Sequence, residues 1–186
     1  MKTSWLVDQF IYDGTQLRPL FCYLQHGLLG NACVAWRGPC DVSFEHMVDG
    51  EDLLQKSQIA GSDMVHFVAE IFDLNLLGGV ALQRLLTGIV RESLVALNPT
   101  QGLKILRDGD DLYWDGRKLS ISVAAKATNS VLIHFAINFS TNGTPVPTAG
   151  LQELNILPED LAKLVLNKFS AEFISIQEAS WKVKPV

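Results

Sequence analysis

The chain has 186 residues, of which 48% are hydrophobic, and its formal net charge is −5 at pH 7. This length and composition suffice for one α/β domain with a substantial core, so residues 1–186 are expected to form a single domain. The acidic balance argues against a protein that binds nucleic acid through a large basic surface.

No segment has the features of a signal peptide, and none is long and apolar enough to cross a bilayer. We therefore expect a cytoplasmic protein with no membrane partner. The three cysteines, Cys22, Cys33 and Cys40, form no paired framework, which suits free thiols in a reducing compartment. Cys40 and His46 match no regular zinc-ligand spacing, so no metal site is predicted.

The N-terminal part of the chain is expected to contain a strand and then a helix. Residues 4–11 are a mixed apolar segment, which favours a first strand that ends at the Asp13-Gly14 turn. Residues 20–29 are mostly apolar and are followed by glycine, which favours a helix.

A short apolar run at residues 32–36 predicts a strand, and the polar segment 37–42 that follows predicts a loop. In one interpretation the exposed backbone of this loop presents Arg37, Gly38 and Asp41 to a ligand. In the other, the Gly-Pro step is a simple turn, and Arg37 and Asp41 form a surface ion pair of little energetic weight. The sequence leaves both interpretations open.

The next elements are a short amphipathic helix at residues 48–56, with its acids near the N-terminus, and an apolar run at residues 59–72. Residues 77–97 carry apolar side chains at helical spacing and predict a long helix that stops at Asn98-Pro99. A strand at residues 102–106 is expected to follow.

A tight hairpin is predicted around Asp115-Gly116, because a turn of this kind needs positive φ and lies here between two apolar runs. Lys118 then lies on the returning strand. Further on, the apolar residues between 131 and 139 fall on every second position, which predicts a strand with one buried face.

The C-terminal part is expected to contain a loop at residues 143–147, a turn at 151–156 and a helix from Pro158 to Phe169.

The segment from Asp111 to His134 resembles the catalytic segment of the lipoate and biotin protein ligases. The similar parts are Asp-Leu-Tyr at 111–113, Gly-Arg-Lys-Leu-Ser at 116–120, and His134 at the start of the alternating strand. The resemblance implies an α/β (α+β) fold with a mixed, largely antiparallel sheet packed with helices. It also implies that Lys118 is catalytic and lies against the acyl carboxyl group and the phosphate of an acyl-adenylate, where an ammonium stabilises developing negative charge.

The same resemblance implies further binding residues. Ser120 and His134 belong to the segment itself, and Asp111 would hold Mg²⁺ or the adenylate. Gly61, Asp63 and His66 look like a reduced form of the glycine-rich turn that wraps the acyl group and adenylate in that family, and together with Arg37 they would line the pocket. For His66, the apolar neighbours favour a hydrogen-bonded, half-buried histidine as strongly as a catalytic one.

Two functions are consistent with this reading. The first is an enzyme that binds a small carboxylate or acyl ligand, with ATP and Mg²⁺ as candidate cofactors and an acyl-carrier protein domain as candidate partner. It would form an acyl-adenylate or acyl thioester, and Cys40 is the candidate nucleophile for the thioester route. The alternative is a non-catalytic module that binds a small ligand or a protein. The missing glycine run and the bulk of Ile121 and Phe135 favour this alternative.

Overall fold

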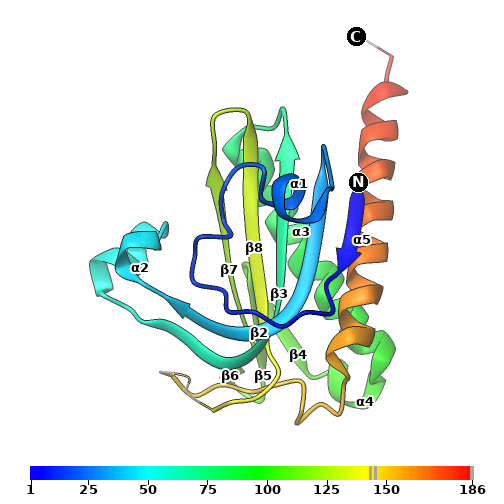
Figure 1. The fold of residues 1–186 in the computed structure, drawn as a ribbon. Coiled ribbons are helices and arrows are strands. Elements are labelled where there is room, and N and C mark those ends of the chain that lie inside the picture. The colour runs from blue at the N-terminus through cyan, green and yellow to red at the C-terminus, as the bar shows by residue number, and fades with distance from the viewer. Residues whose placement is uncertain (143, 145, 185–186) are drawn as a thin grey trace.

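The computed structural model describes residues 1–142, 144 and 146–184. Its centre is a five-stranded sheet in the order β1-β2-β3-β8-β7 (Figure 1). Only β1 is parallel to its neighbour among these strands, and the other pairs are antiparallel. The sheet is therefore mixed and largely antiparallel, as expected. The strands are β1 (Lys2–Trp5), β2 (Ala32–Val42), β3 (Ile59–Phe72), β7 (Ser120–Lys126) and β8 (Ser130–Asn138).

Two long helices, α3 (Leu76–Leu97) and α5 (Pro158–Trp181), cover one face of the sheet (Figure 1). Alternate residues of β3 and β8, such as Phe67 and Phe135, pack there against helix residues that recur every third or fourth position. A smaller helix, α4 (Pro99–Gly102), follows α3 directly. Among the described residues, no helix is long and apolar enough to cross a membrane.

The N-terminal segment covers part of the opposite face. Tyr12 and the short helix α1 (Phe21–His26) pack there on Trp36 and on the second set of alternate residues from β2, β3 and β8. Every residue of β8 is consequently buried. The prediction that this strand buries only one face is wrong, because periodicity in one strand does not reveal what covers its polar-looking side.

The predicted hairpin is present in a second, three-stranded sheet made of β4 (Ile105–Asp108), β5 (Asp111–Trp114) and β6 (Arg117–Lys118). Its two-residue loop has φ values of 52° at Asp115 and 71° at Gly116, which is the combination that a type I′ turn requires. Lys118 follows on the returning strand, as expected, and β7 begins two residues later.

The predicted loop at residues 37–42 is wrong, because β2 continues through Val42. A bulge between Gly38 and Cys40 accommodates Pro39, which has no N–H for the ladder. Gly38 is needed because a Cβ there would collide with the carbonyl of Phe10, where the N-terminal segment crosses β2. The reduced glycine turn is also wrong, since Gly61 lies inside β3.

The remaining elements differ from expectation mainly at their ends. β1 is shorter than the predicted strand at residues 4–11 and ends at Trp5, and β4 begins at Ile105. The helix α5 continues twelve residues beyond the predicted end at Phe169. A 3₁₀ turn (Phe44–His46) and helix α2 (Gly50–Gln55) form the connection between β2 and β3. In the predicted loop at 143–147, residues 143 and 145 lie outside the described part of the chain.

Candidate functional site

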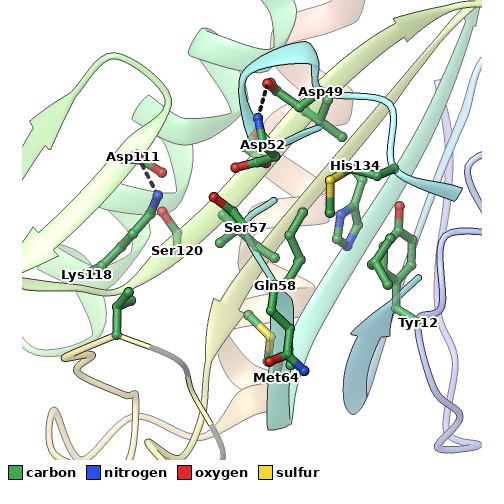
Figure 2. A pocket seen from close by; sticks show the side chains of 18 of the residues that line it. Tyr12, Asp49, Asp52, Ser57, Gln58, Met64, Asp111, Lys118, Ser120 and His134 are labelled. Carbon is green, nitrogen blue, oxygen red and sulfur yellow. Dashed lines mark hydrogen bonds and ion pairs between the residues drawn. The ribbon is translucent and has the colours of Figure 1, made fainter. Parts of the chain in front are cut away.

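A cavity of about 410 Å³ lies on the sheet face opposite α3 and α5. Residues of β3, β7 and β8 line it, together with the connection that carries α2 and with Tyr12 from the N-terminal segment (Figure 2). Lys118 reaches it from the hairpin. The cavity therefore assembles side chains from the first, middle and later parts of the chain.

Lys118 and Asp111 form an ion pair at this cavity, with 2.9 Å between Nζ and Oδ2 (Figure 2). The side chains are 32% and 26% exposed. Burial works to lower the pKa of Lys118, but its hydrogen bond to Asp111 and the nearby charge of Asp52 leave that pKa raised. The ammonium is therefore charged at neutral pH, and a ligand anion that reaches it must share it with Asp111.

The cavity lining is otherwise acidic. Among its described residues, Lys118 is the only lysine or arginine, against five carboxylates from Asp49, Glu51, Asp52, Asp110 and Asp111. Asp49 caps α2 by accepting hydrogen bonds from the backbone of residues 51 and 52. Burial and the neighbouring Asp49 raise the pKa of Asp52. This balance favours a single small anionic group rather than a polyanion.

Ser120 also lines the cavity, at the start of β7. Its Oγ accepts a hydrogen bond of 2.9 Å from the backbone N–H of Leu112. The serine thereby connects β5 to the five-stranded sheet and fixes the position of the hairpin that carries Lys118.

Two histidines lie under the opposite part of the cavity. His134 on β8 lines it, and His66 on β3 is fully buried beside it, with 3.2 Å between His66 Nδ1 and His134 Nε2. His66 Nε2 lies 3.1 Å from the carbonyl oxygen of Gly38. Burial lowers the pKa of His66 to about 4, and burial with the nearby His66 lowers the pKa of His134 well below its usual value. Both rings are neutral at pH 7.

Tyr12 completes this part of the site. Its ring stacks on His134 with 3.6 Å between the ring centroids and an angle of 9° between the planes. Burial raises the pKa of the Tyr12 phenol, so its hydroxyl stays protonated. Figure 2 shows the two rings side by side at the cavity wall.

The structure brings four of the predicted site residues together at the cavity, namely Lys118, Asp111, Ser120 and His134. His66 contacts the site through His134.

The other predicted site residues, Arg37, Gly38, Asp41, Gly61 and Asp63, are not among the residues that line the cavity. Arg37 donates two hydrogen bonds to Asp63, at 2.8 and 2.6 Å, so the interpretation of an Arg37–Asp41 pair is wrong. Its guanidinium also lies over the ring of Phe139, at 4.1 Å from the centroid.

Cys40 lies in strand β2 and is 2% exposed. Burial raises its pKa to about 12, which is opposite to the activation that a nucleophilic thiol needs. Cys22 and Cys33 are also buried. The prediction of Cys40 in a polar loop is therefore wrong.

Sequence reasoning missed Tyr12 and the acids of the α2 connection. Asp49 and Asp52 indicate a binding site only weakly in the sequence, because acidic residues at the start of a helix are common as capping residues. Tyr12 gives no such indication, because its position depends on how the N-terminal segment folds back over the sheet.

The residues present do not fit a triphosphate. A phosphate cradle needs closely approaching backbone N–H groups or several cations, and this cavity offers one paired lysine. Gly61 lies in a strand, with its Cβ position 3.0 Å from the sulfur of Met64. Among the described residues, no group of three or more His, Cys, Asp or Glu side chains is arranged to hold a metal ion.

The fold is similar to that of known biotin protein ligases. A biotin protein ligase from Aquifex aeolicus, solved with biotin and ATP, matches with a TM-score of 0.62 and 13% identity over 95% of this chain and 72% of the ligase. At this identity the likeness shows the fold alone.

Two relatives are similar over the whole chain. A protein of unknown function from Pyrococcus horikoshi has a solved structure with a TM-score of 0.90 and 36% identity, covering 100% of both chains. The uncharacterised protein MJ0805 of Methanocaldococcus jannaschii is 32% identical over 194 residues, which is 100% of this chain and 86% of that protein. The model of a domain of unknown function, DUF366, matches residues 1–184. With this match over nearly its whole length, the chain belongs to the DUF366 family and carries the catalytic-core fold of the biotin protein ligases.

Proposed function

We propose that the cavity binds a small carboxylic acid or acyl ligand, with the carboxyl group at Lys118. The observation that carries this proposal is the charged Lys118, the one lysine or arginine among the described lining residues of a cavity of about 410 Å³. A volume of this size suits a small organic ligand.

The Lys118–Asp111 pair is compatible with such a ligand. A partly exposed ion pair is worth about 0–1 kcal/mol, so an incoming carboxylate can displace or share Asp111 at little cost. The cavity lining includes apolar side chains of the sheet, namely Met64, Ile121 and Val123, and Ile121 lies on β7 between Ser120 and the Val123–His134 pair. A ligand with an apolar chain behind its carboxyl group therefore fits this lining.

The test is thermal unfolding of the purified protein with octanoate, lipoate or biotin. A ligand that binds the native state raises the melting temperature by mass action. We expect at least one of these acids to stabilise the native chain and to lose its effect in Lys118→Ala. Lys104→Ala is the matched control, since Lys104 is exposed, donates a hydrogen bond to the Gln101 side chain and is not among the residues that line the cavity.

The expected result includes an unchanged shift in the Lys104→Ala control. If both variants lose the ligand-induced rise in melting temperature, the rise depends on the overall charge of the protein rather than on the cavity. An equal shift in the native chain and in Lys118→Ala would contradict the role of Lys118.

A second candidate is that the chain activates the bound acid as an acyl-adenylate and passes it to a carrier domain. The placement of Lys118 on the biotin ligase fold favours it, and the poor fit of the cavity to a triphosphate opposes it. The deciding assay is acid-dependent exchange of labelled pyrophosphate into ATP. Exchange that is absent with every acid that binds leaves a non-catalytic binding module.

A further inference from the structure

The buried histidine pair has a defined arrangement of protons. A carbonyl oxygen only accepts hydrogen bonds, so the 3.1 Å contact with Gly38 requires His66 to carry its proton on Nε2. His66 is neutral, and its Nδ1 is then an acceptor. The 3.2 Å contact with His134 is therefore donated by His134 Nε2–H. Since His134 is also neutral, its Nδ1 is left unprotonated as an acceptor.

This acceptor faces no donor from the described part of the chain. Among the described residues, the ring of His134 makes its hydrogen bond through Nε2, and the hydroxyl of Tyr12 makes none. The described buried polar atoms that are both enclosed and unpaired are His26 Nε2 and Trp114 Nε1. His134 Nδ1 and the Tyr12 hydroxyl therefore lack a hydrogen-bond partner but are not enclosed by protein, and both residues line the cavity.

The rings that carry the donor and the acceptor are held in place by packing. Both residues are buried, at 2% exposure for His134 and 3% for Tyr12, and their rings are stacked. Burial and stacking keep the two rings from turning toward other partners, so only the Tyr12 O–H can still rotate. A ligand that fills the cavity without pairing with these atoms leaves them buried and unsatisfied, which is costly, so a ligand group that pairs with both gains affinity.

These atoms lie away from Lys118. His134 is opposite Val123 in the register of β7 and β8, three residues beyond Ser120, which corresponds to about 10 Å of strand. Figure 2 shows the Lys118–Asp111 pair and Ser120 on one side of the cavity and His134 with Tyr12 on the other. A ligand that spans the cavity therefore meets a cation at one end and a neutral donor and acceptor at the other.

We propose that the ligand is a carboxylic acid whose distal end carries a neutral hydrogen-bonding group, such as a hydroxyl, amide or urea. His134 Nδ1 accepts a hydrogen bond from this group, and the Tyr12 hydroxyl donates one to it. A charged distal group is excluded, because it would lose its hydration against two neutral partners. This inference rests on the proposed function and specifies its substrate class.

The first experiment compares two matched acids by calorimetric titration. Octanoate and 8-hydroxyoctanoate differ only by the distal hydroxyl. We expect the hydroxy acid to bind the native chain roughly tenfold or more tightly, since a site built for a polar group disfavours the analogue that lacks it. Equal affinities would overturn the inference and leave the carboxylate site standing. Binding of neither acid would overturn the inference together with the proposed function.

Variants then locate the discrimination. Tyr12→Phe keeps the stacked ring and removes only the hydroxyl, so it should reduce the preference for the hydroxy acid. Tyr23→Phe is the matched control, because Tyr23 is exposed on α1. An unchanged preference in Tyr12→Phe contradicts the inference.

A second measurement does not depend on ligand binding. Nitrogen NMR of the protein labelled in its histidine rings distinguishes protonated from unprotonated ring nitrogens. We expect His134 to carry its proton on Nε2 and to show an unprotonated Nδ1 at pH 7. A proton on Nδ1 would remove the acceptor and with it the inference.

Discussion

The two faces of the sheet differ in how their side chains are used. The face under α3 and α5 is apolar, and its residues alternate along β3 and β8 at the spacing that the sequence displays. The opposite face carries Trp36, His66 and His134 under the N-terminal segment and the cavity. The helix-covered face stabilises the fold, whereas the cavity face holds buried polar groups at a cost in folding free energy.

The largest effect is expected on the helix-covered face. Phe135→Ala removes a fully buried ring and should lower the free energy of unfolding by about 3–5 kcal/mol. Ile121→Ala, on the partly exposed cavity face, should cost less than half as much, because Ile121 lines an open space. Urea denaturation measures both. Equal losses would remove the energetic difference between the faces.

The second effect is a dependence of stability on pH that comes from the cavity face. The pKa of His66 is about 4 in the folded chain and near its ordinary value of 6.5 when unfolded, so the unfolded chain binds more protons between these values. Stability from this group is complete above pH 6.5 and is lost as the pH falls toward 4. The expected loss at pH 5 is about 2 kcal/mol.

Denaturation at pH 5 and 7 tests this expectation. His66→Gln should show a smaller difference between the two pH values than the native chain does. His46→Gln serves as the control, since His46 lies in an exposed turn. A native pH difference that persists in His66→Gln would assign the effect to other groups.

A smaller effect is expected at Arg37. Its paired hydrogen bonds to Asp63 and its contact with Phe139 predict a loss of about 1 kcal/mol in Arg37→Ala. Because Arg37 does not line the cavity, the affinity for the acids that bind should stay unchanged. Weaker binding in this variant would restore the prediction that Arg37 lines the site.

The smallest effect on stability is expected at Lys118. Lys118→Met keeps the length of the side chain and removes a partly exposed ion pair, so the free energy of unfolding should change by less than about 1 kcal/mol. The same variant should lose ligand binding. A large loss of stability would identify Lys118 as a structural residue.

The sequence predicts the helix-covered half of the molecule well. The long helix, the hairpin and the strand that carries His134 follow from periodicity and from one turn that needs positive φ. It also predicts the place of Lys118 on that hairpin, where the resemblance to the ligases lies.

The other half could not be predicted, because its residues acquire their roles from long-range packing. A Gly-Pro step normally marks a turn, and here it lies in a bulged strand crossed by the N-terminal segment. Tyr12 meets His134 only when that segment folds back. Nothing in the local sequence of either residue indicates the other.

The cavity is complete only after the N-terminal segment has docked on the sheet. Tyr12 pairs with Cys40 in an isolated bridge and forms one wall of the cavity, whereas the other walls come from residues 42 onward. A partly folded chain whose sheet has formed before this segment docks therefore has an incomplete cavity. Ligand binding and docking of the first residues are thus thermodynamically linked: each favours the other, and a bound acid protects the N-terminus from local unfolding.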